Sequence, residues 1–82
     1  MSEMSLLELS SLIQRFLNGS VGPWEWDDFT SIKSKDPTIE HYRLAIVDIA
    51  DRFPSPTPEQ WASDAGLDEL RQVAMKIQAL AS

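Results

Sequence analysis

One stretch of the chain, residues 37–53, limits the possible folds more than any other. Its apolar residues recur with a 3-4-3-4 spacing, at Ile39, Tyr42, Ile46, Ile49 and Phe53. This spacing places the side chains on one face of an α-helix. Asp36 is a good N-cap, Pro37 suits the first helical position, and the residue before Pro54 avoids the α region. The stretch therefore predicts a long amphipathic helix that ends before Pro54.

Residues 5–19, SLLELSSLIQRFLNG, predict a helix near the beginning of the chain. Ser5 and Glu8 have the spacing of a capping box, and a start at Ser2 is the alternative. Asn18 and Gly19 are typical of a helix end, because glycine readily adopts the left-handed conformation there. One face of this helix is apolar, with Leu6, Leu9, Ile13 and Phe16.

A shorter helix is expected to start near Pro23, whose fixed φ angle suits the first helical position. Gly22 would then be the N-cap. The apolar spacing continues with Trp26, Phe29 and either Ile32 or the aliphatic stem of Lys33, so we expect these side chains on the inner face of this helix.

The C-terminal part contains a second proline-started pattern. Thr57, Pro58 and Gln60 have the spacing of a cap, a first position and a capping-box partner. We expect this first piece to break near Gly66. A last amphipathic helix should then run from about Leu67 to Leu80.

The chain shows no strand-like alternation of apolar and polar residues. Its 82 residues allow one domain, here residues 1–82. The pattern predicts an all-α fold, a small antiparallel bundle of about four helices crossing at about 20°. Because the connections are short, we expect helices that are consecutive in sequence to lie side by side.

Composition restricts the partners. Thirteen acids and seven bases give a net charge of −6, which disfavours nucleic acid and anionic membranes as partners. The chain has no cysteine, and its N-terminus has neither a basic region nor a continuous apolar run. We therefore expect a cytoplasmic protein without nucleic-acid or membrane partners.

The residues for catalysis or metal binding are sparse. His41 is the sole histidine, and no spacing brings an acid and a nucleophile to it. Asp27 and Asp28 are adjacent, so on a helix they point about 100° apart and do not chelate together. The three glycines fit turns and caps rather than a phosphate loop. We expect no enzyme activity, no cofactor and no metal.

The segment PWEWDDF, residues 23–29, is the strongest candidate for a binding surface. On a helix Trp24 points about 160° away from Trp26 and falls between Asp27 and Asp28. An exposed tryptophan among carboxylates has the composition of an interface hot spot. Alternatively, Trp24 packs on the turn at 19–22 or on the proline-rich linker at 54–58, and we slightly prefer this cover by its own chain. The acids alone suit a helix start, where negative charge is stabilised.

Four segments in order carry a family resemblance: LIQRFLNGSV, WEWDDF, a helix ending in IADRF, and GLDELRQVAMKI after a proline-rich connection. This layout resembles the small bacterial immunity proteins of the colicin D type and their uncharacterised relatives. The resemblance covers nearly the full length. It implies a four-helix antiparallel bundle that plugs the positively charged cleft of a tRNA-cleaving toxin, in part by imitating the charge of the substrate.

We therefore expect a non-enzymatic inhibitor of the immunity or antitoxin type that binds a basic toxin domain, possibly a nuclease, as a monomer or weak homodimer. The first expected contact cluster consists of Trp24, Glu25, Asp27 and Asp28. A second, weaker cluster consists of Asp48 and Asp51 on the outer side of the helix at 37–53. The alternative is an acidic helical adaptor or self-associating protein unrelated to toxins.

Overall fold

The structure, a computed structural model, describes residues 4–22, 24–57 and 60–81. Within these ranges the chain forms four helices and no strand: α1 (Leu6–Asn18), α2 (Glu25–Ser31), α3 (Pro37–Arg52) and α4 (Asp64–Ala81). The prediction of a compact all-α domain is confirmed. No helix in the described ranges is long and apolar enough to cross a membrane.

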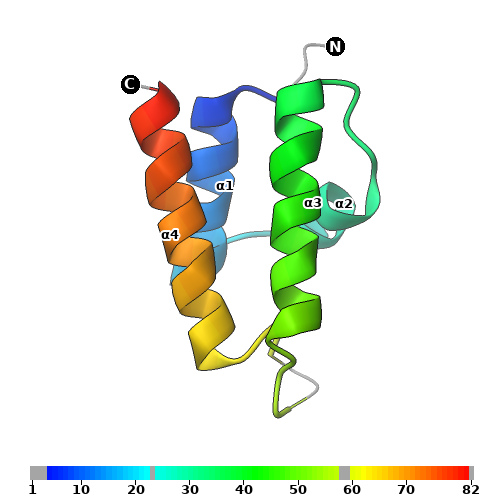
Figure 1. Cartoon of the computed structure of the whole chain (residues 1–82), viewed down its shortest axis with the longest axis vertical. Coiled ribbons are helices and arrows are strands. Elements are labelled where there is room, and N and C mark those ends of the chain that lie inside the picture. Colours follow the sequence, from blue (N-terminus) through cyan, green and yellow to red (C-terminus); the bar gives the residue numbers. More distant parts are fainter. Residues whose placement is uncertain (1–3, 23, 58–59, 82) are drawn as a thin grey trace.

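Three helices run along the long axis of the molecule, and the short α2 lies beside α3 (Figure 1). α4 runs antiparallel to both α1 and α3. The most extensive helix–helix contact joins α1 to α4, the first helix to the last, and α4 also packs on α3. The expectation of side-by-side consecutive helices holds for α2 with α3 and for α3 with α4, whereas the main partner of α1 is distant in sequence.

The predicted caps of α1 and α3 are confirmed. Ser5 Oγ accepts a hydrogen bond from Glu8 N–H at 3.1 Å, and Glu8 Oε1 accepts one from Ser5 N–H at 3.3 Å. Gly19 ends α1 in the left-handed conformation, with φ of 75°. The Asp36 side chain accepts hydrogen bonds from the free backbone N–H groups at the start of α3. Local side-chain chemistry thus determines where these two helices begin.

The core lies between the inner faces of the four helices. Phe16 of α1 stacks on Trp26 of α2 with ring centroids 4.1 Å apart, and the Trp61 ring is nearly perpendicular to both, with its centroid 5.6 Å from each. This aromatic cluster joins α1, α2 and the segment before α4. The buried members of the core cluster are Leu9, Leu12, Ile13, Trp26, Ile39, Tyr42, Ile46, Ile49, Leu70, Ala74 and Ile77.

The predicted boundaries of α2 need correction. The helix begins at Glu25 with Trp24 as its cap, and not with Gly22 as the cap, while Pro23 lies outside the described residues. Glu25 Oε1 nevertheless accepts a hydrogen bond from Gly22 N–H at 3.2 Å. Ile32 is 64% exposed and Lys33 is exposed as well, so the predicted inner position is wrong for both. The reason is that α2 ends at Ser31 and the backbone of Ile32 is extended.

The prediction of a helix break near Gly66 is wrong. α4 begins at Asp64 and continues through Gly66, and residues 60–63 are not helical. The proposed start at Pro58 lies outside the described residues. A Cβ atom at position 66 would lie 2.8 Å from Phe53 Cβ and 2.9 Å from Ala62 Cβ. Glycine therefore serves close packing here, because it lets the first turn of α4 approach the end of α3.

Candidate functional site

Three exposed residues lie at intervals of four, from Trp24 at the cap of α2 through Asp28 within the helix to Ile32, the residue that follows its end. Asp28 N–H donates to Trp24 O at 2.9 Å, and Ile32 N–H donates to Asp28 O at 3.0 Å. Residues four apart on a helix are surface neighbours. Trp24 is 73% exposed and Ile32 is 64% exposed, and Asp28 between them is exposed as well. We call Trp24, Asp28 and Ile32 the α2 stripe.

The exposure of Trp24 decides between the two alternatives left open by the sequence. Cover by its own chain, the slightly preferred alternative, is wrong. Trp26 takes the inward position instead, with 6% of its surface exposed, and stacks on Phe16. Trp24 points away from this stack because two helical steps of about 100° each place it about 160° from Trp26 around the helix axis. One tryptophan of the pair is therefore core, and the other is surface.

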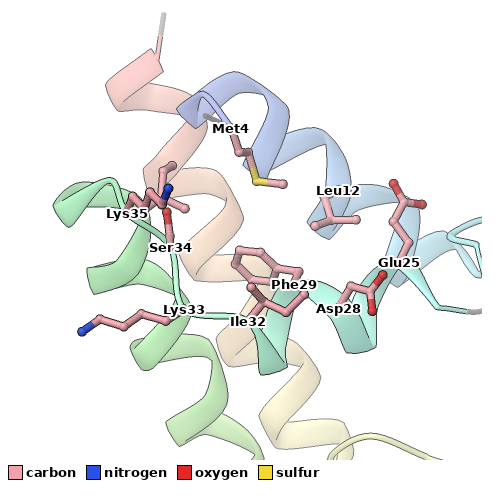
Figure 2. A pocket seen from close by; sticks show the side chains of 10 residues that line it. Met4, Leu12, Glu25, Asp28, Phe29, Ile32, Lys33, Ser34 and Lys35 are labelled. Atoms are coloured by element: carbon pink, nitrogen blue, oxygen red, sulfur yellow. The ribbon is translucent and has the colours of Figure 1, made fainter. Parts of the chain in front are cut away.

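A hollow of about 510 Å³ lies alongside α2, which we call the α2 groove. Figure 2 shows two side chains projecting into it, Phe29 from α2 and Met4 from the segment before α1. Asp28 lies toward one end and Lys35 toward the other, while Lys33 extends away. The groove is lined by Met4, Leu12, Glu25, Asp28, Phe29, Ile32, Lys33, Ser34, Lys35 and Ile39.

The acids near the stripe differ in whether their charge is already compensated. Glu25 accepts two hydrogen bonds from the Arg15 guanidinium at 2.7 and 2.8 Å. These bonds, and then the bond from Gly22 N–H, lower the pKa of Glu25. Asp27 and Asp28 are exposed and form no ion pair within the described residues. Glu25 thus holds α2 against α1, and the adjacent aspartates carry the uncompensated charge.

The second expected cluster lies on α3. Asp48 pairs with Arg52 at 2.6 Å, as the i,i+4 spacing predicts, and Asp51 is exposed. Both lie on the outer face of α3 together with Leu44. In the described part of the chain, no hydrogen bond or ion pair connects these aspartates to the α2 stripe. The structure therefore gives no direct link between the two predicted clusters.

A charged network that is not among the sequence predictions fixes the connection between α2 and α3. Arg43 donates two hydrogen bonds to Glu40 at 2.7 Å and a third to Thr30 O at 2.7 Å. Glu40 also accepts one from Ser34 N–H at 2.9 Å. The bonds from Arg43, and then from Ser34, lower the pKa of Glu40 to about 2. The i,i+3 spacing of Glu40 and Arg43 is a sequence signal for their ion pair. It does not indicate that the pair bonds Thr30 O and Ser34 N–H.

The arrangement offers recognition chemistry. His41 is exposed on α3 with its ring edge-on to Tyr42, at a centroid distance of 5.3 Å. Among the residues that the structure describes, no three His, Cys, Asp or Glu side chains come together in a way that could hold a metal ion. The α2 stripe instead presents an aromatic ring, a carboxylate and an aliphatic side chain beside an apolar groove. These groups suit contact with another macromolecule.

Comparison of the chain with family models, curated proteins and solved structures found no match. The resemblance to colicin D-type immunity proteins therefore rests on the layout of the sequence.

Proposed function

We propose that this chain is a non-enzymatic inhibitor of the immunity or antitoxin type, which neutralises a basic bacterial toxin domain by binding it through the α2 stripe and Asp27. The observation that carries the proposal is the 73% exposure of Trp24 next to aspartates without an ion-pair partner in the described residues. Tryptophan is among the residues most enriched at binding hot spots, because a partner that covers its large side chain removes much apolar surface from water.

Charge supports a basic partner. The net charge of −6 would accelerate encounter with a positive surface. All four arginines are paired with an acid inside the molecule, in Arg15–Glu25, Arg43–Glu40, Arg52–Asp48 and Arg71–Asp68. Asp27 and Asp28 are outside these pairs. They can therefore bind a partner's Lys or Arg without breaking an internal ion pair.

The site is also held in place before a partner arrives. α2 has seven residues, too few for a stable isolated helix, so tertiary contacts maintain it. The Arg15–Glu25 pair and the Phe16–Trp26 stack connect α2 to α1. Such preorganisation reduces the entropy lost on binding.

A growth assay tests the proposed function. The product of the reading frame immediately upstream is expressed in a bacterial host, alone and together with this chain. We expect the product to stop growth alone and the chain to restore growth. Trp24→Ala should weaken the rescue, whereas Leu44→Ala, which removes an exposed apolar side chain from α3, should leave it intact. A harmless product, or toxicity that the chain does not relieve, would contradict the proposal.

A second candidate function is self-association, as in an adaptor protein. It is supported by two exposed apolar residues on the paired helices α1 and α4, Leu7 at 64% and Met75 at 63% exposure. Sedimentation equilibrium at about 100 µM distinguishes the candidates. A dimer that Met75→Lys dissociates would favour self-association, and a monomer would count against it.

A further inference from the structure

We infer that the α2 groove receives a single apolar side chain of the basic partner, whose neighbouring Lys or Arg pairs with Asp28. The identity of that partner as a toxin rests on the proposed function, but the chemistry of the occupant follows from the groove itself. The inference adds a second contact area beside the exposed Trp24.

The size and lining of the groove suit an apolar side chain. Its volume of about 510 Å³ falls within the range of about 300–1,000 Å³ typical of binding pockets. Its apolar side chains come from several parts of the chain: Met4, Leu12, Phe29, Ile32 and Ile39. Figure 2 shows Met4 and Phe29 facing the same space from opposite sides. Ile32, at the edge of the groove, remains 64% exposed until something covers it.

The charges at the groove indicate which side chain accompanies the apolar one. At the α2 end, Glu25 is paired with Arg15, so Asp28 supplies the uncompensated charge. A cation next to the apolar side chain would therefore be attracted there, and an anion repelled. Lys33 and Lys35 lie at the other end, and Lys33 points away from the groove (Figure 2). The arrangement fits an apolar residue adjacent to Lys or Arg, approaching from the Asp28 end.

Titration of the isotopically labelled chain with three capped peptides tests the inference by NMR. The peptides are acetyl-Gly-Lys-Phe-Gly-amide and its two relatives with Ala in place of Phe or Glu in place of Lys. We expect the Lys-Phe peptide to shift the backbone amide signals of residues 29–35 with a millimolar dissociation constant. The Lys-Ala and Glu-Phe peptides should bind at least fivefold more weakly.

Matched variants locate the binding. Asp28→Lys and Ile32→Lys should weaken the Lys-Phe peptide at least threefold. Glu69→Lys reverses an exposed acid on α4, and Leu44→Lys replaces an exposed aliphatic residue on α3. These two control variants should bind within a factor of two of the unchanged chain.

Three results would overturn the inference: no saturable shifts at residues 29–35, equal binding of the Phe and Ala peptides, or tighter binding of the Glu-Phe peptide. The growth assay and the peptide titration can fail independently of each other. Rescue without peptide binding would reject the groove and keep the inhibitor proposal. Peptide binding without rescue would keep the groove and reject the toxin partner.

Discussion

At the scale of single residues, Trp24 and Trp26 show how one residue type takes opposite roles two positions apart. Trp26 is buried against Phe16, whereas Trp24 is 73% exposed. We predict that Trp26→Ala lowers the free energy of unfolding by about 3–5 kcal/mol, because it leaves a cavity in the aromatic cluster. Trp24→Ala should change it by less than about 0.5 kcal/mol. Urea unfolding followed by circular dichroism measures both, and equal losses would contradict the assigned positions.

Gly66 is a second residue-scale case. A methyl group there would meet the Cβ atoms of Phe53 and Ala62 at 2.8 and 2.9 Å, neither of which can move without the backbone. We predict that Gly66→Ala destabilises the fold by about 1–3 kcal/mol, despite the better helix propensity of alanine. Gly22→Ala is the control, since its Cβ would meet only the Glu25 side chain, at 3.6 Å. A Gly66→Ala variant as stable as the unchanged chain in urea would refute this packing role.

The residue scale also shows what sequence reasoning can reach. Helical angles separate Trp24, Asp27 and Asp28 from Trp26 without any knowledge of the fold, so they could be named as candidates. The angles could not decide whether Trp24 is covered, and the slightly preferred alternative is wrong. Ile32 was placed on the wrong side, because the spacing continues past Ser31 although the helix does not. Asp28 has no ion-pair partner in the described residues because Arg15 pairs with Glu25 instead, and this pairing is determined by the tertiary structure.

At the scale of elements, the connection between α2 and α3 depends on the Glu40–Arg43 network. The pKa of Glu40 is lowered from 4.5 to about 2, so the folded state favours the charged carboxylate more than the unfolded state does. The stabilisation is therefore fully present above about pH 4.5 to 5 and is lost as the pH falls toward 2. We predict that Glu40→Gln lowers the urea midpoint at pH 7 and that its difference from the unchanged chain shrinks steadily down to pH 2.

The control for this prediction is Glu69→Gln, which removes an exposed acid on α4. Its midpoint should differ little from that of the unchanged chain at both pH values. A Glu40→Gln effect that stays constant from pH 7 to pH 2 would show that the lost side chain acts through packing rather than charge.

Elements differ in how far local sequence determines them. α1 and α3 begin where Ser5 and Asp36 cap them, so their starts could be predicted from neighbouring residues. The start of α4 also has a local cap, because Ser63 Oγ accepts a hydrogen bond from Gly66 N–H at 3.3 Å. The contacts that hold this start against the rest of the fold are not local, because Trp61 packs into the aromatic cluster and Ser63 N–H donates to Phe53 O at 3.0 Å. These contacts join residues whose proximity exists only in the folded molecule.

At the scale of the whole molecule, the all-α class followed from periodicity, but the pairing of α1 with α4 did not. Short connections favour neighbours in sequence, whereas α1 covers the apolar face of α4 at the far end of the chain. The α2 groove also depends on the arrangement of the whole molecule. Its lining comes from Met4, α1, α2, the following connection and α3. The groove therefore cannot be predicted from any single segment of the sequence.

The molecule as a whole combines a preformed α2 stripe with a net charge of −6. We propose that Asp27 and Asp28 bind a basic partner. Isothermal titration with the upstream reading-frame product tests this most directly. The compared proteins are the unchanged chain, Asp27→Lys with Asp28→Lys, and the charge-matched Asp64→Lys with Glu69→Lys on α4.

All three should show the same helical circular dichroism. We predict that the α2 variant binds at least tenfold more weakly and that the α4 variant stays within about threefold of the unchanged chain, because only the former removes contacts with the partner. Equal weakening of both variants would show that net charge alone drives binding. Unchanged affinity of the α2 variant would contradict the assigned site.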